Sequence, residues 1–296
     1  NTAGMTVNRW CGSSMQSIHI AAGAIAMGAG NAFICCGVES MSRVPMNGFN
    51  PMPHPKLHED NPNVYLSMGT TAENVAKKYQ LTRKAQQNFA ISSHVKASTA
   101  ESKGYFRDEI TTINKCSKDG GIRPNTTQEI LDGLKLAFDE NGTITAGTSS
   151  PLTDGAAATL VCDEEYAKSN NLDILARILS TAVEGCAPEV MGLGPIGASN
   201  KALKRANLSI KDIDIVELNE AFASQSLACI KDLNIDEKKV NIDGGAIALG
   251  HPLGATGARI TGKAADLLRR ENKKYALSTQ CIGLGQGIAT VLETVN

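Results

Sequence analysis

The sequence has few aromatic residues, no charge excess and no long apolar segment. Phe, Trp and Tyr make up 4% of its 296 residues, and 29 basic side chains are balanced by 30 acidic ones. This balance provides no general attraction to nucleic acid or anionic lipid, so an anionic ligand must be bound by local groups. No apolar run approaches a membrane span, and the first residues lack a signal-peptide pattern. We therefore expect a soluble chain that neither binds nucleic acid nor inserts into a membrane.

The eight cysteines also lack a recognisable pairing pattern. Only Cys35 and Cys36 are adjacent, and no two cysteines have the CxxC spacing. In a chain of this length, such a distribution fits neither a disulfide framework nor a zinc site. We therefore expect a reducing compartment, the cytoplasm, and no metal ion as cofactor.

Cys11 is the most informative residue because it lies between a strand-like segment, residues 4–9, and a helix-like apolar periodicity that follows it. At the first turn of a helix, free backbone N–H groups and the helix dipole favour a thiolate over a thiol. This context is typical of a nucleophile. The alternative is a small buried apolar side chain, as most intracellular cysteines are.

Strand-like and helix-like segments alternate over residues 175–292. The expected strands are residues 175–183, 213–218, 240–242, 275–279 and 288–292, and the expected helices are residues 198–206, 221–233 and 257–270. Apolar strands that alternate with helices over short connections predict an α/β domain with a mostly parallel sheet.

The first part of the chain shows the same order less completely, with expected strands at residues 5–9, 32–37, 143–146 and 157–162. Since the segments around Cys11 resemble those around residues 257–270, we predict two related halves, residues 1–166 and 173–296. On this alignment the first half lacks an opening strand–helix–strand–helix unit. The chain also begins at Asn1, so we expect that a leading segment is absent.

An inserted loop domain is expected at about residues 45–142. Residues 41–70 contain five prolines and four methionines, which predicts a long loop suited to adaptable apolar contacts. Residues 70–103 then favour two helices, the second capped by Thr82.

His251 lies between Gly250 and Pro252 in a glycine-rich turn, residues 244–257. A neutral imidazole there could accept a thiol proton or donate to an oxyanion. The alternative is a histidine that only stabilises the turn. The glycines do not form GxGxxG, and the P-loop-like spacing of residues 257–263 ends in Ala264 where magnesium binding needs Ser or Thr.

Cys281 and Asn219 follow two other expected strands. Cys281 opens a glycine-rich segment whose backbone N–H groups could form an oxyanion hole, although a buried cysteine at a turn is equally consistent. Asn219 could be a helix N-cap and nothing more. However, ligands gather at the carboxyl ends of strands in open α/β sheets. Two thiols, an imidazole and an amide there would supply the acyl acceptor, the acid/base and the enolate site for Claisen chemistry on a thioester.

Four blocks of the sequence resemble the signatures of the thiolase family, in family order. They are residues 7–14 (VNRWCGSS), 219–222 (NEAF), 250–252 (GHP) and 281–283 (CIG). The likeness runs from the first residues to the last and is greatest to the bacterial 3-ketoacyl-CoA thiolases of fatty-acid β-oxidation. It implies the five-layered αβαβα fold of two related halves, with an inserted loop domain that binds CoA. Members of the family have a further strand–helix segment before the nucleophile block.

The resemblance also implies roles for individual residues. Cys11 matches the acyl-accepting nucleophile and Cys281 the acid/base. His251 and Asn219, the latter through a water, match the hole that stabilises the enolate, and the N–H groups of Cys11 and Gly283 match a second oxyanion hole. The residues that match substrate contacts are Ser150 at the pantetheine arm, Arg123 at the adenine, and Met68 and Met191 at the acyl end.

The implied reaction is cleavage of 3-ketoacyl-CoA, with CoA as co-substrate and no metal, to acetyl-CoA and a shortened acyl-CoA. Ser67 stands where short-chain biosynthetic relatives tend to carry a histidine, which weakens the alternative of an acetoacetyl-CoA thiolase. A ketoacyl synthase would carry another histidine or a lysine at Cys281, and a non-catalytic acyl-CoA- or lipid-binding homologue would have lost one of the two cysteines. The implied partners are a second copy, as a homodimer or homotetramer, and a β-oxidation hydratase/dehydrogenase subunit.

Overall fold

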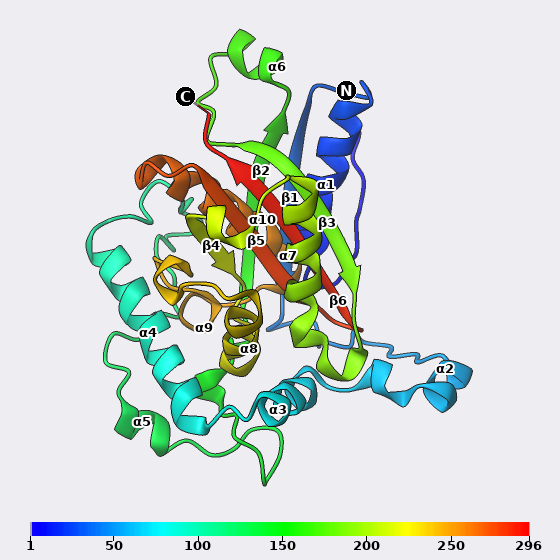
Figure 1. Cartoon of the computed structure of the whole chain (residues 1–296), viewed down its shortest axis with the longest axis vertical. Coiled ribbons are helices and arrows are strands. Elements are labelled where there is room, and N and C mark those ends of the chain that lie inside the picture. Colours follow the sequence, from blue (N-terminus) through cyan, green and yellow to red (C-terminus); the bar gives the residue numbers. More distant parts are fainter. Residues whose placement is uncertain (1, 296) are drawn as a thin grey trace.

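The computed structural model describes residues 2–295 and contains two β-sheets with helices between and beside them (Figure 1). The first sheet pairs β1 (Ala32–Ser40) with β2 (Asp154–Cys162) in antiparallel orientation. The second sheet has the order β3-β6-β5-β4. Its strands are β3 (Arg177–Gly185), β4 (Ile215–Leu218), β5 (Tyr275–Ile282) and β6 (Gln286–Glu293).

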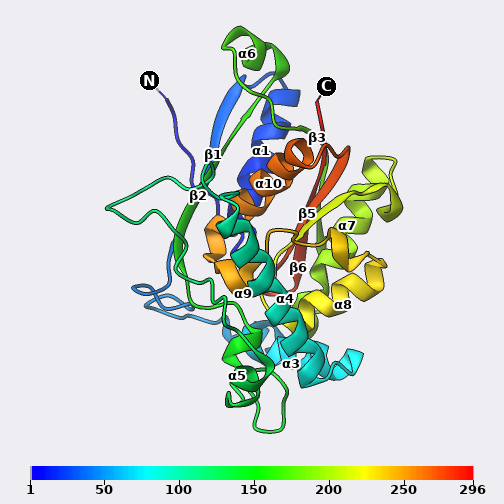
Figure 2. The same ribbon diagram turned by 90° about the vertical axis from the view of Figure 1, so that its left-hand side faces the viewer.

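Helices α1 (Ser13–Ala26) and α10 (Leu253–Arg270) lie side by side between the two sheets, and α7 (Gly194–Arg205) and α8 (Ala223–Leu233) lie beyond the four-stranded sheet (Figure 2). On the outer face of β1, Ile34 and Val38 are 77% and 76% exposed. Within residues 2–295 the layers are therefore sheet, helices, sheet, helices.

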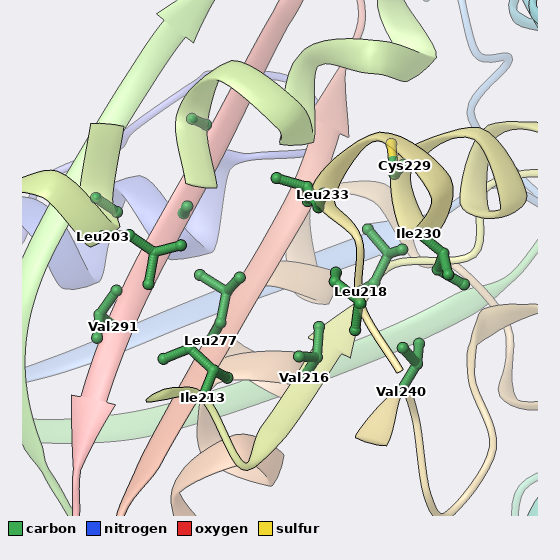
Figure 3. Close-up of a cluster of buried hydrophobic side chains, with 14 of the residues drawn as sticks. Leu203, Ile213, Val216, Leu218, Cys229, Ile230, Leu233, Val240, Leu277 and Val291 are labelled. Atoms are coloured by element: carbon green, nitrogen blue, oxygen red, sulfur yellow. The ribbon is translucent and has the colours of Figure 1, made fainter. Parts of the chain in front are cut away.

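Both faces of the four-stranded sheet are covered, and its strands are correspondingly apolar. On the α8 side, Val216, Leu218 and Leu277 contact Ile230 and Leu233 (Figure 3). On the other side, Ile282 and Ile288 contact residues of the two central helices. The strand ends that carry the candidate site therefore project from a closely packed apolar core.

The segment between β1 and β2 consists of helices joined by long loops. Its elements are α2 (Pro55–Asp60), η1 (Pro62–Tyr65), α3 (Met68–Tyr79), α4 (Arg83–Ser102), α5 (Gln128–Asp132) and η2 (Ala146–Thr148). As predicted, Thr82 caps α4, because its side chain accepts a hydrogen bond from the Ala85 N–H at 3.2 Å. The remaining elements are α6 (Glu164–Ser169), η3 (Pro188–Leu193), η4 (Ile210–Asp212), η5 (Glu237–Lys239) and α9 (Ala246–Leu249). None of the helices in residues 2–295 is both long and apolar enough to span a membrane.

Three predicted strands are wrong. Residues 5–9, 143–146 and 240–242 form only isolated bridges, such as those of Arg9 with Cys11 and of Val240 with Val216. The sheet is also not mostly parallel: β4 and β5 are parallel, but β6 is antiparallel to both of its neighbours. The reason is the short connection from β5 to β6, in which Leu284 and Gly285 have φ of 67° and 91°. So short a connection can only reverse the chain into a hairpin.

Candidate functional site

Cys11 lies on a turn just before α1 and is buried, with 7% of its surface exposed. The chain reverses at Trp10, whose φ is 45°. A Cβ at Gly12 would lie 2.5 Å from Ile282 Cδ1, so glycine there lets the turn pack directly against the end of β5. Gln280, also on β5, donates from Nε2 to the Cys11 carbonyl. The sequence predicted a helix at Cys11 but neither the turn before that helix nor these contacts with β5.

The expectation that the helix N-terminus favours a Cys11 thiolate is wrong for the free protein. Helix α1 begins only at Ser13, and burial of the thiol raises its pKa to about 11. The backbone N–H groups of Gly283 and of Cys11 itself interact with the sulfur and act in the opposite direction, but desolvation outweighs them. Cys11 is therefore a neutral thiol at neutral pH, and nucleophilic attack requires a base.

His251 is buried in the turn between α9 and α10, where Gly250 has a φ of 95°. Its Nδ1 lies 2.6 Å from Thr256 Oγ1 in the first turn of α10, and that hydroxyl donates to the Pro252 carbonyl at 3.3 Å. A hydroxyl that donates to a carbonyl can accept from Nδ1–H, and this tautomer leaves the lone pair on Nε2. Burial, with a smaller effect of Arg259, lowers the His251 pKa to about 4. The imidazole is therefore neutral at neutral pH.

Asn219 directly follows β4, and its backbone N–H donates to Thr279 on β5 at 3.0 Å. Its side chain is 1% exposed, with Nδ2 at 3.4 Å from both ring nitrogens of His251. The alternative of an N-cap is wrong, because Phe222 occupies that position of α8. In residues 2–295 the Asn219 Oδ1 has no hydrogen-bond partner, so one acceptor remains free beside the imidazole.

Cys281 lies within β5, opposite Gly287 of β6, rather than after the strand end as expected. It is 1% exposed and packs with Met191 and Ala221. Burial, followed by the neighbouring thiol of Cys11, raises its pKa well above the usual value. The two thiols therefore share one buried region, and both are protonated at neutral pH.

The residues matched to substrate contacts lie in two places. Met68, at the start of α3, packs beside Cys281, and its sulfur would be 3.8 Å from a Cβ at Gly283. Ser150 reaches the same region, because its N–H donates to the Ala221 carbonyl at 3.0 Å. Arg123 lies in the segment after α4, where its N–H donates to His94 Nδ1 at 3.2 Å.

Sequence reasoning missed Thr256, Gln280 and Glu220, which contact or adjoin the expected residues. Thr256 could have been suspected, since it lies one turn beyond His251 at a helix start. Gln280, within β5, and Glu220, just after β4, could have been noticed as polar residues in buried segments, but their partners lie far away in the sequence. In residues 2–295 no three His, Cys, Asp or Glu side chains are grouped so that they could hold a metal ion.

Comparison with known families identifies the class of protein. The family described as "Thiolase, N-terminal domain" matches residues 1–165, and "Thiolase, C-terminal domain" matches residues 172–294. The chain therefore belongs to the thiolase family, and the predicted thiolase fold is confirmed. Of the five predicted layers, residues 2–295 form four, because the outer face of β1 is exposed rather than covered by helices.

Curated relatives within the family share about half of the residues of this chain. The 3-ketoacyl-CoA thiolase of Shewanella frigidimarina is 50% identical, over 99% of this chain and 79% of its own length. That of Bacillus subtilis is 47% identical, over 98% of this chain and 78% of its own length.

Two solved structures of human mitochondrial 3-ketoacyl-CoA thiolase have the same fold. The first has a TM-score of 0.91 and 40% identity, covering 100% of this chain and 79% of that chain. The second, in complex with CoA, has a TM-score of 0.89 and 41% identity, covering 98% and 78%.

Proposed function

We propose that the protein is an acyltransferase that cleaves 3-ketoacyl-CoA with CoA to acetyl-CoA and an acyl-CoA two carbons shorter, as in fatty-acid β-oxidation. The observation that carries the proposal is the burial of Cys11, Cys281, His251 and Asn219 around the end of β5. The names of the curated relatives and of the solved structures support the substrate class.

The first step begins with two neutral groups. His251 Nε2 accepts the proton of the Cys11 thiol, and the sulfur then attacks the keto carbon of the substrate. The negative charge on the keto oxygen is stabilised by the backbone N–H groups of Cys11 and Gly283, which already interact with the sulfur.

In the second step the bond between C2 and C3 breaks, the acyl group stays on Cys11, and the electron pair forms the enolate of acetyl-CoA. The enolate oxygen is stabilised by His251, now protonated, and by a water bound to Asn219, whose Oδ1 is free to accept. Cys281 then protonates C2 and becomes a thiolate. Its raised pKa suits this step, because the group must first be a thiol.

In the third step the Cys281 thiolate takes the proton of the incoming CoA thiol. The CoA sulfur attacks the acyl carbon, the bond to Cys11 breaks, and the Cys11 sulfur regains its proton from His251. All protons and electron pairs are accounted for, and both cysteines return to the thiol state.

The finer assignments rest on family likeness. We propose that the two halves are residues 1–166 and 173–296, and that residues 45–142 form the domain that binds CoA, with Arg123 at the adenine and Ser150 at the pantetheine arm. We further propose a cytoplasmic homodimer or homotetramer that associates with a hydratase/dehydrogenase subunit. An acetoacetyl-CoA thiolase or a non-catalytic homologue fits less well, because the relatives are named 3-ketoacyl-CoA thiolases and both buried cysteines are present.

The test is the CoA-dependent loss of 3-ketoacyl-CoA absorbance over a series of chain lengths, with identification of the products by mass. The expected products are acetyl-CoA and the shortened acyl-CoA in equal amounts. Tight binding of the substrate without turnover would support the non-catalytic alternative instead.

A further inference from the structure

Glu220 follows Asn219 directly and takes part in none of the steps above. It is 2% exposed, and its carboxylate accepts three hydrogen bonds. The donors are Ser93 Oγ at 2.6 Å, Asn241 Nδ2 at 2.8 Å and the Ile247 N–H at 3.1 Å. Burial raises the Glu220 pKa, and the three donors oppose this by stabilising the charged form.

The three donors come from separate segments of the chain. Ser93 lies in α4 of the inserted segment, Asn241 lies in the loop after β4 and α8, and Ile247 lies in α9, four residues before His251. Glu220 therefore joins the segment that carries Asn219 to the segment that leads to His251.

Further contacts also join the segment that carries Asn219 to the segment that leads to His251. Ser93 Oγ accepts from the Gly245 N–H at 3.1 Å, and a Cβ at Gly245 would collide with the Glu220 carboxyl group. The Asn241 side chain forms two hydrogen bonds with Leu218 at the end of β4. Its Oδ1 accepts from the Leu218 N–H at 2.9 Å, and its Nδ2 donates to the Leu218 carbonyl at 2.8 Å. Residues 241–251 are not part of a strand. The side-chain hydrogen bonds of Glu220, Ser93 and Asn241, rather than backbone pairing in a sheet, therefore fix the position of this segment.

We infer that Glu220 is a positioning residue. It holds Asn219 and His251 in the relative positions that form the hole for the enolate oxygen. The inference rests on the proposed function. An oxyanion hole is effective only if its donors are fixed before charge develops, and small displacements weaken it strongly. Gln at this position would keep the volume of the side chain. However, its NH₂ group can only donate, so at least one of the three donors would lose its acceptor.

Two partial reactions of the acetylated enzyme separate this role from a general loss of structure. The first is exchange of the methyl hydrogens of acetyl-CoA with D₂O, which requires the enolate hole and Cys281. The second is removal of the acetyl group from Cys11 by CoA, which requires Cys281, the N–H groups of Cys11 and Gly283, and His251 to return the proton to the Cys11 sulfur. Only the first requires the enolate hole, and therefore only the first depends on the position of Asn219 relative to His251.

We expect Glu220→Gln to slow hydrogen exchange by ~10²-fold, the usual effect of losing one oxyanion donor, and to change deacetylation less than about threefold. The matched control is Glu217→Gln, three residues earlier in the chain and within β4. Glu217 is also buried, has no hydrogen-bond partner in residues 2–295, and has a pKa that burial raises to about 8. Because Glu217 is largely a neutral acid at neutral pH, its amide should leave both partial reactions unchanged.

If Glu220→Gln does not fold, Ser93→Ala tests the positioning role instead, because it removes the donor of the shortest of the three hydrogen bonds to Glu220. It should slow hydrogen exchange about tenfold and leave deacetylation unchanged. Equal losses in both partial reactions, or no loss in hydrogen exchange, would overturn the positioning role. A wild-type protein that is never acetylated at Cys11 would overturn the proposed function, and the inference with it.

Discussion

The two thiols of the site are buried to a similar degree but are held in different ways. Cys281 belongs to β5, and its position is set by the ladder with Gly287 of β6. Cys11 lies on a turn outside both sheets, and it is held by side-chain contacts that reach across to β5 and β6. These contacts are Gly12 against Ile282, Gln280 to the Cys11 carbonyl, and Arg9 Nη1 to Gln286 Oε1 at 2.6 Å.

This difference indicates which substitutions should affect each thiol. Backbone ladders tolerate most side-chain changes, whereas a docked turn depends on each of a few contacts. We therefore expect that changes to the docking contacts impair the chemistry of Cys11 and leave that of Cys281 nearly intact. Substitutions at the two thiols and at the residues that contact them test this distinction.

The largest effect is expected from Cys11→Ser. A 3-ketoacyl-CoA added without free CoA should acylate Cys11 in the wild type, and the variant should show no adduct and lose at least ~10⁴-fold in turnover. Cys281→Ser should also lose turnover but keep the adduct. Peptide mass mapping checks both variants, and a label on Cys281 or Cys186 would reverse the two roles.

His251→Ala should lower kcat by at least the ~10²-fold typical of losing one oxyanion donor. The affinity for CoA should change much less, because His251 acts on charge that develops only during the reaction. Steady-state kinetics and equilibrium binding of CoA separate the two quantities. A collapse of CoA binding with normal turnover at saturation would assign His251 to the binding site.

The docking contact of Gln280 provides the direct test of the comparison. Gln280→Met keeps the length of the side chain and removes the donor to the Cys11 carbonyl, so acylation of Cys11 should slow by about tenfold, the effect of one lost hydrogen bond. The rate is measured by quenched mass spectrometry. If hydrogen exchange on acetylated enzyme falls as much as acylation does, the two thiols are not held independently.

The sequence predicted most helices and, within a few residues, each strand of the two sheets that the structure describes, because their apolar periodicity follows local rules. It also predicted which residues converge, because signature blocks of the family carry them. It did not predict that Cys281 lies inside a strand, that β6 returns antiparallel, or that Cys11 is a neutral thiol. These features depend on the β5–β6 turn, on pairing across the sheet and on desolvation by distant segments, none of which is encoded in the spacing of neighbouring residues.

Thr256→Val tests the hydrogen bond that orients His251. Valine has nearly the same shape but cannot pair with Nδ1, so the imidazole loses the partner that leaves Nε2 as its reactive nitrogen. We expect kcat to fall by about tenfold with little change in the KM for CoA. Thr256→Ser keeps the hydroxyl and should remain close to the wild type. A similar loss in both variants would point to packing of the first turn of α10 instead.

The smallest expected effect is the change in kcat/KM for each CH₂ added to the acyl chain of the substrate. Met68 and Met191 pack around Cys281, and the sulfur of Met68 lies beside Gly283, whose N–H interacts with the Cys11 sulfur. An acyl tail on Cys11 should therefore extend along apolar surface on the Cys281 side, and each buried CH₂ contributes about 0.8 kcal/mol, roughly fourfold in kcat/KM. We expect kcat/KM to rise with chain length above acetoacetyl-CoA until the apolar surface ends. Met68→Phe should shorten this surface and move the optimum to shorter substrates, while a wild-type optimum at four carbons would favour the biosynthetic alternative.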